Sequence, residues 1–153
     1  MLTPLLMIFI LVLPVLVAAA VPRLRSRRRD AGAISLGILF LFTASGHFVQ
    51  TQAMAQMLPA WVPQREALVY VTGIMEIAVA VGFFVPRWRR GAGWAAIAVL
   101  AGFFPANVYA AVHHVPMGGH AWGPVYLLVR APLQVFLLWW AWYFVLRRGG
   151  PRR

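Results

Sequence analysis

The sequence predicts an all-α fold, a polytopic transmembrane helical bundle, and three observations support this class. First, 62% of the 153 residues are hydrophobic and only 11% are charged, a balance that one soluble core of this size would not bury. Second, five apolar stretches each approach the roughly 20 residues that a helix needs to cross a bilayer. Third, the arginines lie in short clusters between these stretches, as in the cytoplasmic loops of membrane proteins.

The five predicted spans divide the chain into parts. A membrane β-strand would show about ten residues of alternating hydrophobicity, whereas these runs are longer and apolar on all sides. We therefore expect helices at residues 2–21, 31–50, 67–85, 92–112 and 125–146. The chain then consists of an N-terminal transmembrane helix (1–22), a basic cytoplasmic loop (23–30), a four-helix membrane domain (31–146) and a basic cytoplasmic tail (147–153).

The arginine clusters also predict the orientation. RLRSRRR follows the first span, PRWRR follows the third, and RRGGPRR ends the chain, so alternate connections hold twelve of the fourteen basic residues. Because short basic loops are retained in the cytoplasm, we expect the N-terminus outside and the C-terminus inside. The alternative is a first segment that is cleaved as a signal peptide at VAAAV. Its start, MLTP, has no basic residue, and cleavage would place five arginines outside, so we favour the uncleaved helix.

The outer connections carry their own signals. In residues 51–66, Pro59 and Pro63 prevent one long helix, and Trp61 suits the headgroup boundary, so an interfacial or re-entrant segment is expected. In the next outer connection, Gly118 and Gly119 predict a tight turn that leads back into the last span.

The absence of cysteine limits the chemistry. A chain with no cysteine has no disulfide, no iron–sulfur cluster and no thiolate zinc site. The basic clusters are brief and suit anionic lipid headgroups, so we expect no nucleic-acid partner. A redox function would therefore need a cofactor or a partner subunit.

Several polar residues lie inside the predicted spans, where an ionisable group costs roughly 2.5–3.5 kcal/mol at a helix centre. Glu76 lies near the midplane, and the others lie nearer the outer end. Helical periodicity places one polar stripe on each of four helices, and we expect these stripes to share an outward-facing pocket. The predicted pocket residues are His47, Glu76, Asn107, Arg130 and Gln134, and the predicted outer rim consists of Gln50, His113, His114, His120 and Tyr126.

Other interpretations of these residues stay open. Asn107 and Gln134 are also explained as residues that hydrogen-bond one helix to another. Glu76 and Arg130 are also explained as a structural ion pair. The histidine spacing HHxxxxxH is weak support for zinc or copper, and a haem held by His47 has no attachment motif behind it. We therefore predict no metal site.

Five segments together resemble the bacterial DoxX-like membrane protein family, in order and spacing. They are SGHF (45–48), MLPAWVP (57–63), VTGIMEI (71–77), FPANVYAAV (104–112) and LLVRAPLQ (127–134). The resemblance implies a four-helix membrane core over residues 31–146, with the first helix as an addition, in the bacterial cytoplasmic membrane. It also implies a link to thiosulfate:quinone oxidoreductase or to oxidative-stress complexes, and it points to the same five pocket residues.

These observations lead to three functional hypotheses. We expect an accessory or scaffold component of a redox or stress-related membrane complex, not an enzyme on its own, with a pocket for a small ligand such as a quinone headgroup. The second hypothesis is a membrane subunit of a quinone-linked oxidoreductase, dependent on a redox partner. The third is transport of protons or small solutes, which is disfavoured because few polar residues continue a path below Glu76 and Gln134.

Overall fold

The computed structural model describes residues 2–147, and within that range the chain consists of helices and turns without a β-strand. Five helical segments are long and apolar enough to cross a membrane. This confirms the all-α class and the expectation of five helices long and apolar enough to span a membrane, and it is consistent with a multi-pass membrane protein. The five segments are Leu2–Ala20, Pro22–Val49, Arg65–Phe84, Arg89–Val112 and His120–Leu146.

Two of these segments begin earlier than the hydropathy predicts, because short helices of another type lead into them. The 3₁₀ helix η1 (Pro22–Arg27) runs directly into α2 (Arg28–Val49), and η2 (His120–Tyr126) runs into α6 (Leu127–Ala141). The last segment ends as η3 (Trp142–Leu146), which has π-helical hydrogen bonding. The apolar runs thus locate the long helices, while these short first turns extend them beyond the runs.

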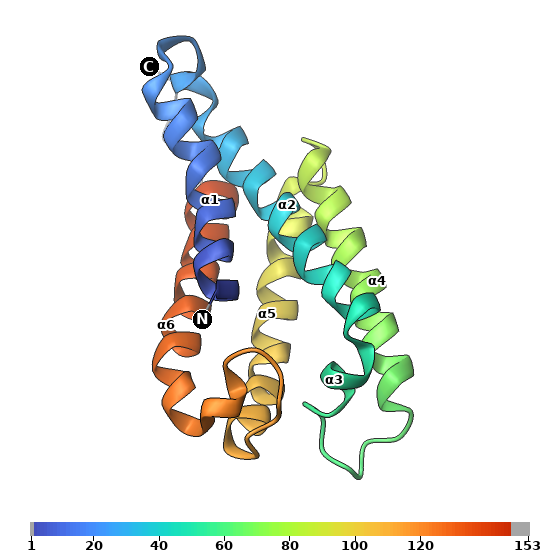
Figure 1. The fold of residues 1–153 in the computed structure, drawn as a ribbon. Helices are drawn as coiled ribbons and strands as arrows, with labels where there is room; N and C mark the ends of the chain where they lie inside the picture. Colours follow the sequence, from blue (N-terminus) through green and yellow to red (C-terminus); the bar gives the residue numbers. More distant parts are fainter. Residues whose placement is uncertain (1, 148–153) are drawn as a thin grey trace.

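Helix α5 (Arg89–Val112) lies near the middle of the molecule, with other helices on either side of it (Figure 1). On one side, α2 crosses the molecule diagonally and packs along α4 (Arg65–Phe84), whereas α1 (Leu2–Ala20) and α6 lie on the other side (Figure 1). α1 packs mainly on α2 and only weakly on α6. The short α3 (Thr51–Ala55) ends before Pro59, so the connection to α4 continues as turns.

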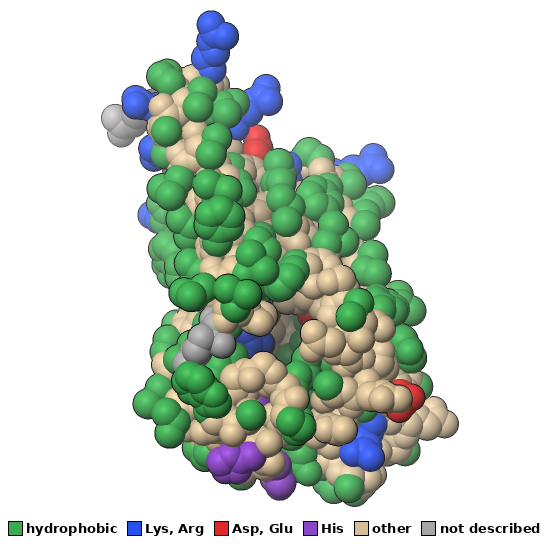
Figure 2. All heavy atoms as spheres, in the orientation of Figure 1, with side chains coloured by type: hydrophobic (Ala, Val, Ile, Leu, Met, Phe, Trp, Pro, Cys, Tyr) green, Lys and Arg blue, Asp and Glu red, His purple; other side chains and the backbone are tan. Residues whose placement is uncertain are grey.

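The two ends of the bundle differ in charge. Figure 2 shows basic side chains at one end, apolar side chains along the sides, and histidine at the opposite end. We call the first the arginine-rich end; it contains η1, the α4–α5 connection and the end of η3. Large apolar side chains are exposed along the helices between the ends, with Ile74 60% and Leu128 76% exposed. Such sides suit a hydrocarbon environment.

The apolar core occupies the arginine-rich half. Leu36, Ala80, Phe83 and Leu137 are fully buried and come from α2, α4 and α6. In the same half, the indole Nε1 of Trp140 donates a 3.2 Å hydrogen bond to the Gly32 carbonyl, which ties α6 to α2. The polar residues of the spans are therefore left in the other half, on helices held in place by this core.

Candidate functional site

A first polar cluster forms between α2 and α4, and we call it the carboxylate cluster: His47, Thr72 and Glu76. The Nε2 atom of His47 lies 3.7 Å from Oε2 of Glu76. On the other edge of the ring, Nδ1 lies 2.9 Å from the Val69 carbonyl oxygen and 3.1 Å from the Thr72 hydroxyl. His47 is 8% exposed and Glu76 5%. The ring is thus held between two neighbouring helices, with one nitrogen directed at the carboxylate.

The hydrogen bonds of His47 show that its contact with Glu76 lacks a proton donor. Because Nδ1 faces a carbonyl oxygen, it donates its proton to Val69, and in the neutral ring Nε2 is then an acceptor. The Glu76 Oε2 atom is also an acceptor when the carboxyl is ionised. Oε2 is buried and has no hydrogen-bond partner among the described residues. A proton, or a donor from another molecule, is needed to make this pair of acceptors favourable.

Close approach of the two helices brings the cluster together. Gly73 lies on α4 between Val69 and Glu76, and a Cβ atom there would lie 2.7 Å from the Cβ of His47. Only glycine therefore leaves room for α2 at this level of the bundle. The site depends on this small residue as much as on the polar ones.

A second polar cluster joins α5, η2 and α6, and we call it the guanidinium cluster: Asn107, His120 and Arg130. Nε of Arg130 donates a 2.9 Å hydrogen bond to Oδ1 of Asn107, and His120 Nε2 lies 3.2 Å from the same oxygen. Asn107 in turn donates through Nδ2 to the Phe103 carbonyl at 2.8 Å. Asn107 and His120 are buried, and Arg130 is half-buried. One amide oxygen thus lies against both the His120 ring and the Arg130 guanidinium.

Arg130 does not pair with Glu76, so the ion pair considered from the sequence is wrong. Among the described residues the only ion-pair contact of Glu76 is with His47. Arg130 instead donates through Nε to Asn107, on the neighbouring helix. The two Nη groups of Arg130 make no hydrogen bond within residues 2–147, so four N–H donors stay available.

The two clusters meet at Phe103. Its ring lies 5.9 Å from the His47 ring, centroid to centroid, and its carbonyl accepts the hydrogen bond of Asn107. Gln134, one turn deeper than Arg130, donates to the Leu100 carbonyl at 2.6 Å and contacts neither cluster through a hydrogen bond. The stripes thus form two polar clusters that both contact Phe103, one at its ring and the other at its main-chain carbonyl.

Two residues expected on the rim lie inside the molecule. His120 is 7% exposed and Tyr126 5%, and their rings meet edge to face at 4.8 Å. The connection before them turns through Gly118, whose φ is +56°, and Gly119 packs against Tyr126. This turn folds the connection inward, so His120 belongs to the guanidinium cluster and not to the rim.

The other expected rim residues are exposed. His113 stacks on Tyr109 with 3.9 Å between ring centroids, His114 lies in the left-handed region at φ 50°, and Gln50 caps the end of α2. Over residues 2–147 no group of three His, Asp or Glu side chains is arranged to hold a metal ion. His113 and His114 are exposed whereas His120 is buried, so the histidines of HHxxxxxH do not share one environment.

Helical spacing places Thr72 and Gly73 on the same stripe as Glu76, but it did not predict that Thr72 would meet His47 or that Gly73 would admit α2. The role of Phe103 was missed. A glycine inside a helix opposite a polar stripe is a weaker signal, because close packing on another helix is one of several reasons for it. Nothing in the sequence distinguishes Phe103 from the other phenylalanines of the spans.

The comparisons with known proteins give one match. Residues 36–145 match a family described as a domain of unknown function, DUF8561. No curated protein and no solved structure matches the chain. The match includes both polar clusters but begins after α1, η1 and the first turns of α2.

Proposed function

The chain belongs to the DUF8561 family, and we propose from its site that it is a DoxX-like accessory or scaffold protein of a redox or stress-related membrane complex. In this proposal it lies in the bacterial cytoplasmic membrane, with the polar clusters in the outer half. Its ligand is a small ring compound with carbonyl or hydroxyl oxygens, such as a quinone headgroup. The DoxX-like segments and the arginine distribution support the class and the orientation.

One observation carries the choice of ligand: among the residues that the structure describes, the buried Oε2 of Glu76 has no donor and the Nη groups of Arg130 have no acceptor. A quinone carbonyl accepts from a guanidinium, and a quinol hydroxyl donates to a carboxylate. Phe103, which contacts both clusters, offers an aromatic face to a planar ring. Donor, acceptor and aromatic surface thus lie in one half of the molecule.

The surface of this half is hollowed. Figure 2 shows a depression in the half that also carries the histidines, with basic and acidic side-chain atoms visible inside it. A ligand could reach the clusters through this depression. In the orientation that the arginines favour, this depression lies in the side of the outer half of the protein.

Binding of decylubiquinol, whose hydroxyls can donate to Glu76 and accept from Arg130, to the purified protein in a neutral detergent under reducing conditions tests the proposal. Glu76→Gln and Arg130→Gln each remove one charged hydrogen-bonding group, so we expect each to weaken binding by tenfold or more, from roughly 1.5–3 kcal/mol per charged hydrogen bond. Glu66→Gln, an exposed change on the same helix as Glu76, is the matched control and should bind as the parent does. Quenching of tryptophan fluorescence gives the dissociation constants.

Two results would contradict the proposal. The first is that the parent protein shows no saturable binding up to the solubility limit of the quinol. The second is equal affinity of the Glu76→Gln, Arg130→Gln and Glu66→Gln variants, which would mean that the quinol binds elsewhere on the apolar surface. A circular dichroism spectrum of each variant shows whether its helices are retained.

A further inference from the structure

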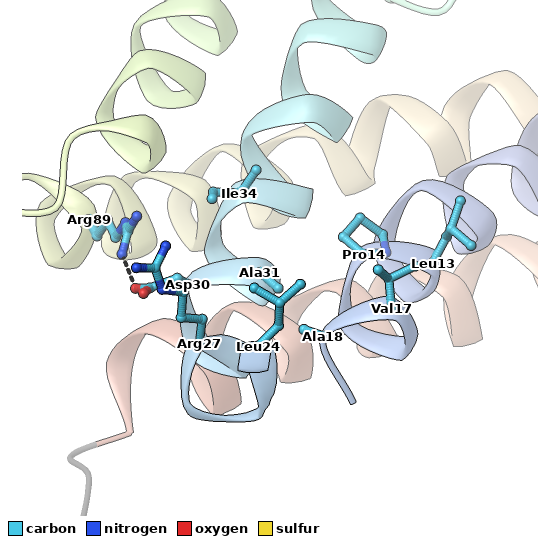
Figure 3. A pocket seen from close by; sticks show the side chains of 10 residues that line it. All are labelled: Leu13, Pro14, Val17, Ala18, Leu24, Arg27, Asp30, Ala31, Ile34 and Arg89. Carbon is cyan, nitrogen blue, oxygen red and sulfur yellow. Dashed lines mark hydrogen bonds and ion pairs between the residues drawn. The ribbon is translucent and has the colours of Figure 1, made fainter. Parts of the chain in front are cut away.

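A cavity of about 500 Å³ lies at the arginine-rich end, far from the polar clusters. Its walls come from the last two turns of α1, from η1 and from the first turns of α2, with one residue at the start of α5 (Figure 3). Most of it therefore precedes residue 36, where the family match begins. The cavity belongs to the part of this chain that is added to the family domain.

The cavity has an apolar body. Leu13, Val17 and Ile34 line it with Pro14, and proline also interrupts the hydrogen bonding of α1 at this level. The segment of α1 from Leu13 to Ala20 covers roughly 10 Å along the helix axis at 1.5 Å per residue. This depth is comparable to the headgroup boundary and the upper part of an acyl chain.

The same cavity has a basic edge. Arg89 forms an ion pair with Asp30, and Figure 3 shows Arg27 on the same side of the cavity, next to this pair. Arg27 forms no hydrogen bond or ion pair with any residue in 2–147. Two arginines and one aspartate leave one positive charge uncompensated at the edge. More arginines follow in η1 and at the start of α2.

From this combination we propose that the cavity binds an anionic phospholipid of the cytoplasmic leaflet. The phosphate contacts Arg27 and Arg89, and an acyl chain lies against Leu13, Val17 and Ile34. A soluble anion would contact the basic edge but not the apolar walls. A neutral lipid would contact the apolar walls but would gain nothing from the basic edge. The second cavity at this end, of about 480 Å³, has only Arg87 as a basic lining residue.

The proposal gives the additional helix a role. α1 contributes four of the cavity residues and packs mainly on α2, so a lipid in the cavity would fill the space between α1 and the family domain. The proposal is independent of the quinone site, because the two use different residues at opposite ends of the bundle.

Native mass spectrometry of the full-length protein in neutral detergent tests the proposal with dioleoyl phosphatidylglycerol and dioleoyl phosphatidylcholine. We expect at least tenfold tighter binding of the anionic lipid. Arg27→Gln should remove most of this preference. The control Arg23→Gln changes an exposed η1 residue outside the cavity, so it should weaken binding of the anionic lipid no more than about fivefold, as expected for one arginine near an anionic surface.

A second pair of variants tests the apolar walls. Val17→Trp fills the cavity and should reduce binding of phosphatidylglycerol at least fivefold, whereas Leu16→Trp places the same residue on the neighbouring exposed position and should not. Glycerol phosphate, which has the anion without acyl chains, should not compete at millimolar concentration.

Any of three results overturns the proposal: equal binding of the two lipids, equal effects within either pair of variants, or full competition by glycerol phosphate. The last would assign the basic edge to soluble phosphates. Arg27 and Val17 are both exposed enough that these substitutions should leave the fold intact, and the helical circular dichroism signal checks this.

Discussion

Replacement of Gly73 by alanine is the most direct test of how the carboxylate cluster is built. The new Cβ would lie 2.7 Å from the Cβ of His47 and 3.1 Å from the nearest ring atom of Phe48. Ordinary van der Waals contact begins at 3.4 Å, so the first distance is about 0.7 Å too short. The Cβ of His47 is fixed to the backbone of α2 and cannot rotate away. Relief therefore requires α2 and α4 to separate.

The expected cost follows from two opposing contributions. Overpacking of a close contact destabilises by about 1–3 kcal/mol. Alanine also favours a helix over glycine by about 1 kcal/mol, which offsets part of this cost. Gly102→Ala is the matched control, because it makes the same change inside α5 where no heavy atom lies within 4 Å of the new Cβ. The difference between the two variants therefore isolates the packing contribution, about 1–3 kcal/mol in favour of Gly102→Ala.

Unfolding in mixed micelles of increasing dodecyl sulfate content, followed by helical circular dichroism, measures both free energies. Gly73→Ala should unfold at lower dodecyl sulfate content than the parent, and Gly102→Ala at an equal or higher one. If Gly73→Ala is as stable as Gly102→Ala, the two helices do not approach closely at this level and the described geometry of His47 and Glu76 is wrong.

Three further predictions concern orientation and the guanidinium cluster. Because the chain has no cysteine, a single introduced cysteine can be labelled without background. Gln56→Cys should react with a membrane-impermeant maleimide in intact spheroplasts, whereas Ser26→Cys should react only after lysis. The reverse pattern would refute the predicted orientation. Asn107→Leu removes the acceptor that orients Arg130, so the free energy of unfolding should fall by about 1–3 kcal/mol. An unchanged free energy of unfolding would show that this hydrogen bond contributes nothing to stability. Gly119→Ala places a Cβ atom against the ring of Tyr126 and should lower the free energy of unfolding by about 1–3 kcal/mol. An unchanged free energy of unfolding would mean that the ring moves freely.

The five spans could be predicted because their cause is local. About 20 apolar residues in a row form a helix in a bilayer wherever they pack, since lipid offers no partner to backbone polar groups. The same holds for the break after α3, because Pro59 and Pro63 act on their own backbone. Depth along a helix also follows from residue count alone, so the sequence indicates that Glu76 and Asn107 lie within spans.

The partners of those polar residues were decided only by the tertiary structure. Periodicity shows which face of its own helix each of Arg130 and Glu76 occupies, but it does not show how those helices are rotated relative to one another. In the fold, Arg130 contacts Asn107. His120 became part of the cluster through backbone angles at Gly118 that no hydropathy pattern encodes. The sequence by itself thus determined which segments are helices and how deep their polar groups lie, because these depend on neighbours along the chain. Which groups meet depends on contacts between distant segments, and these exist only once the helices are packed.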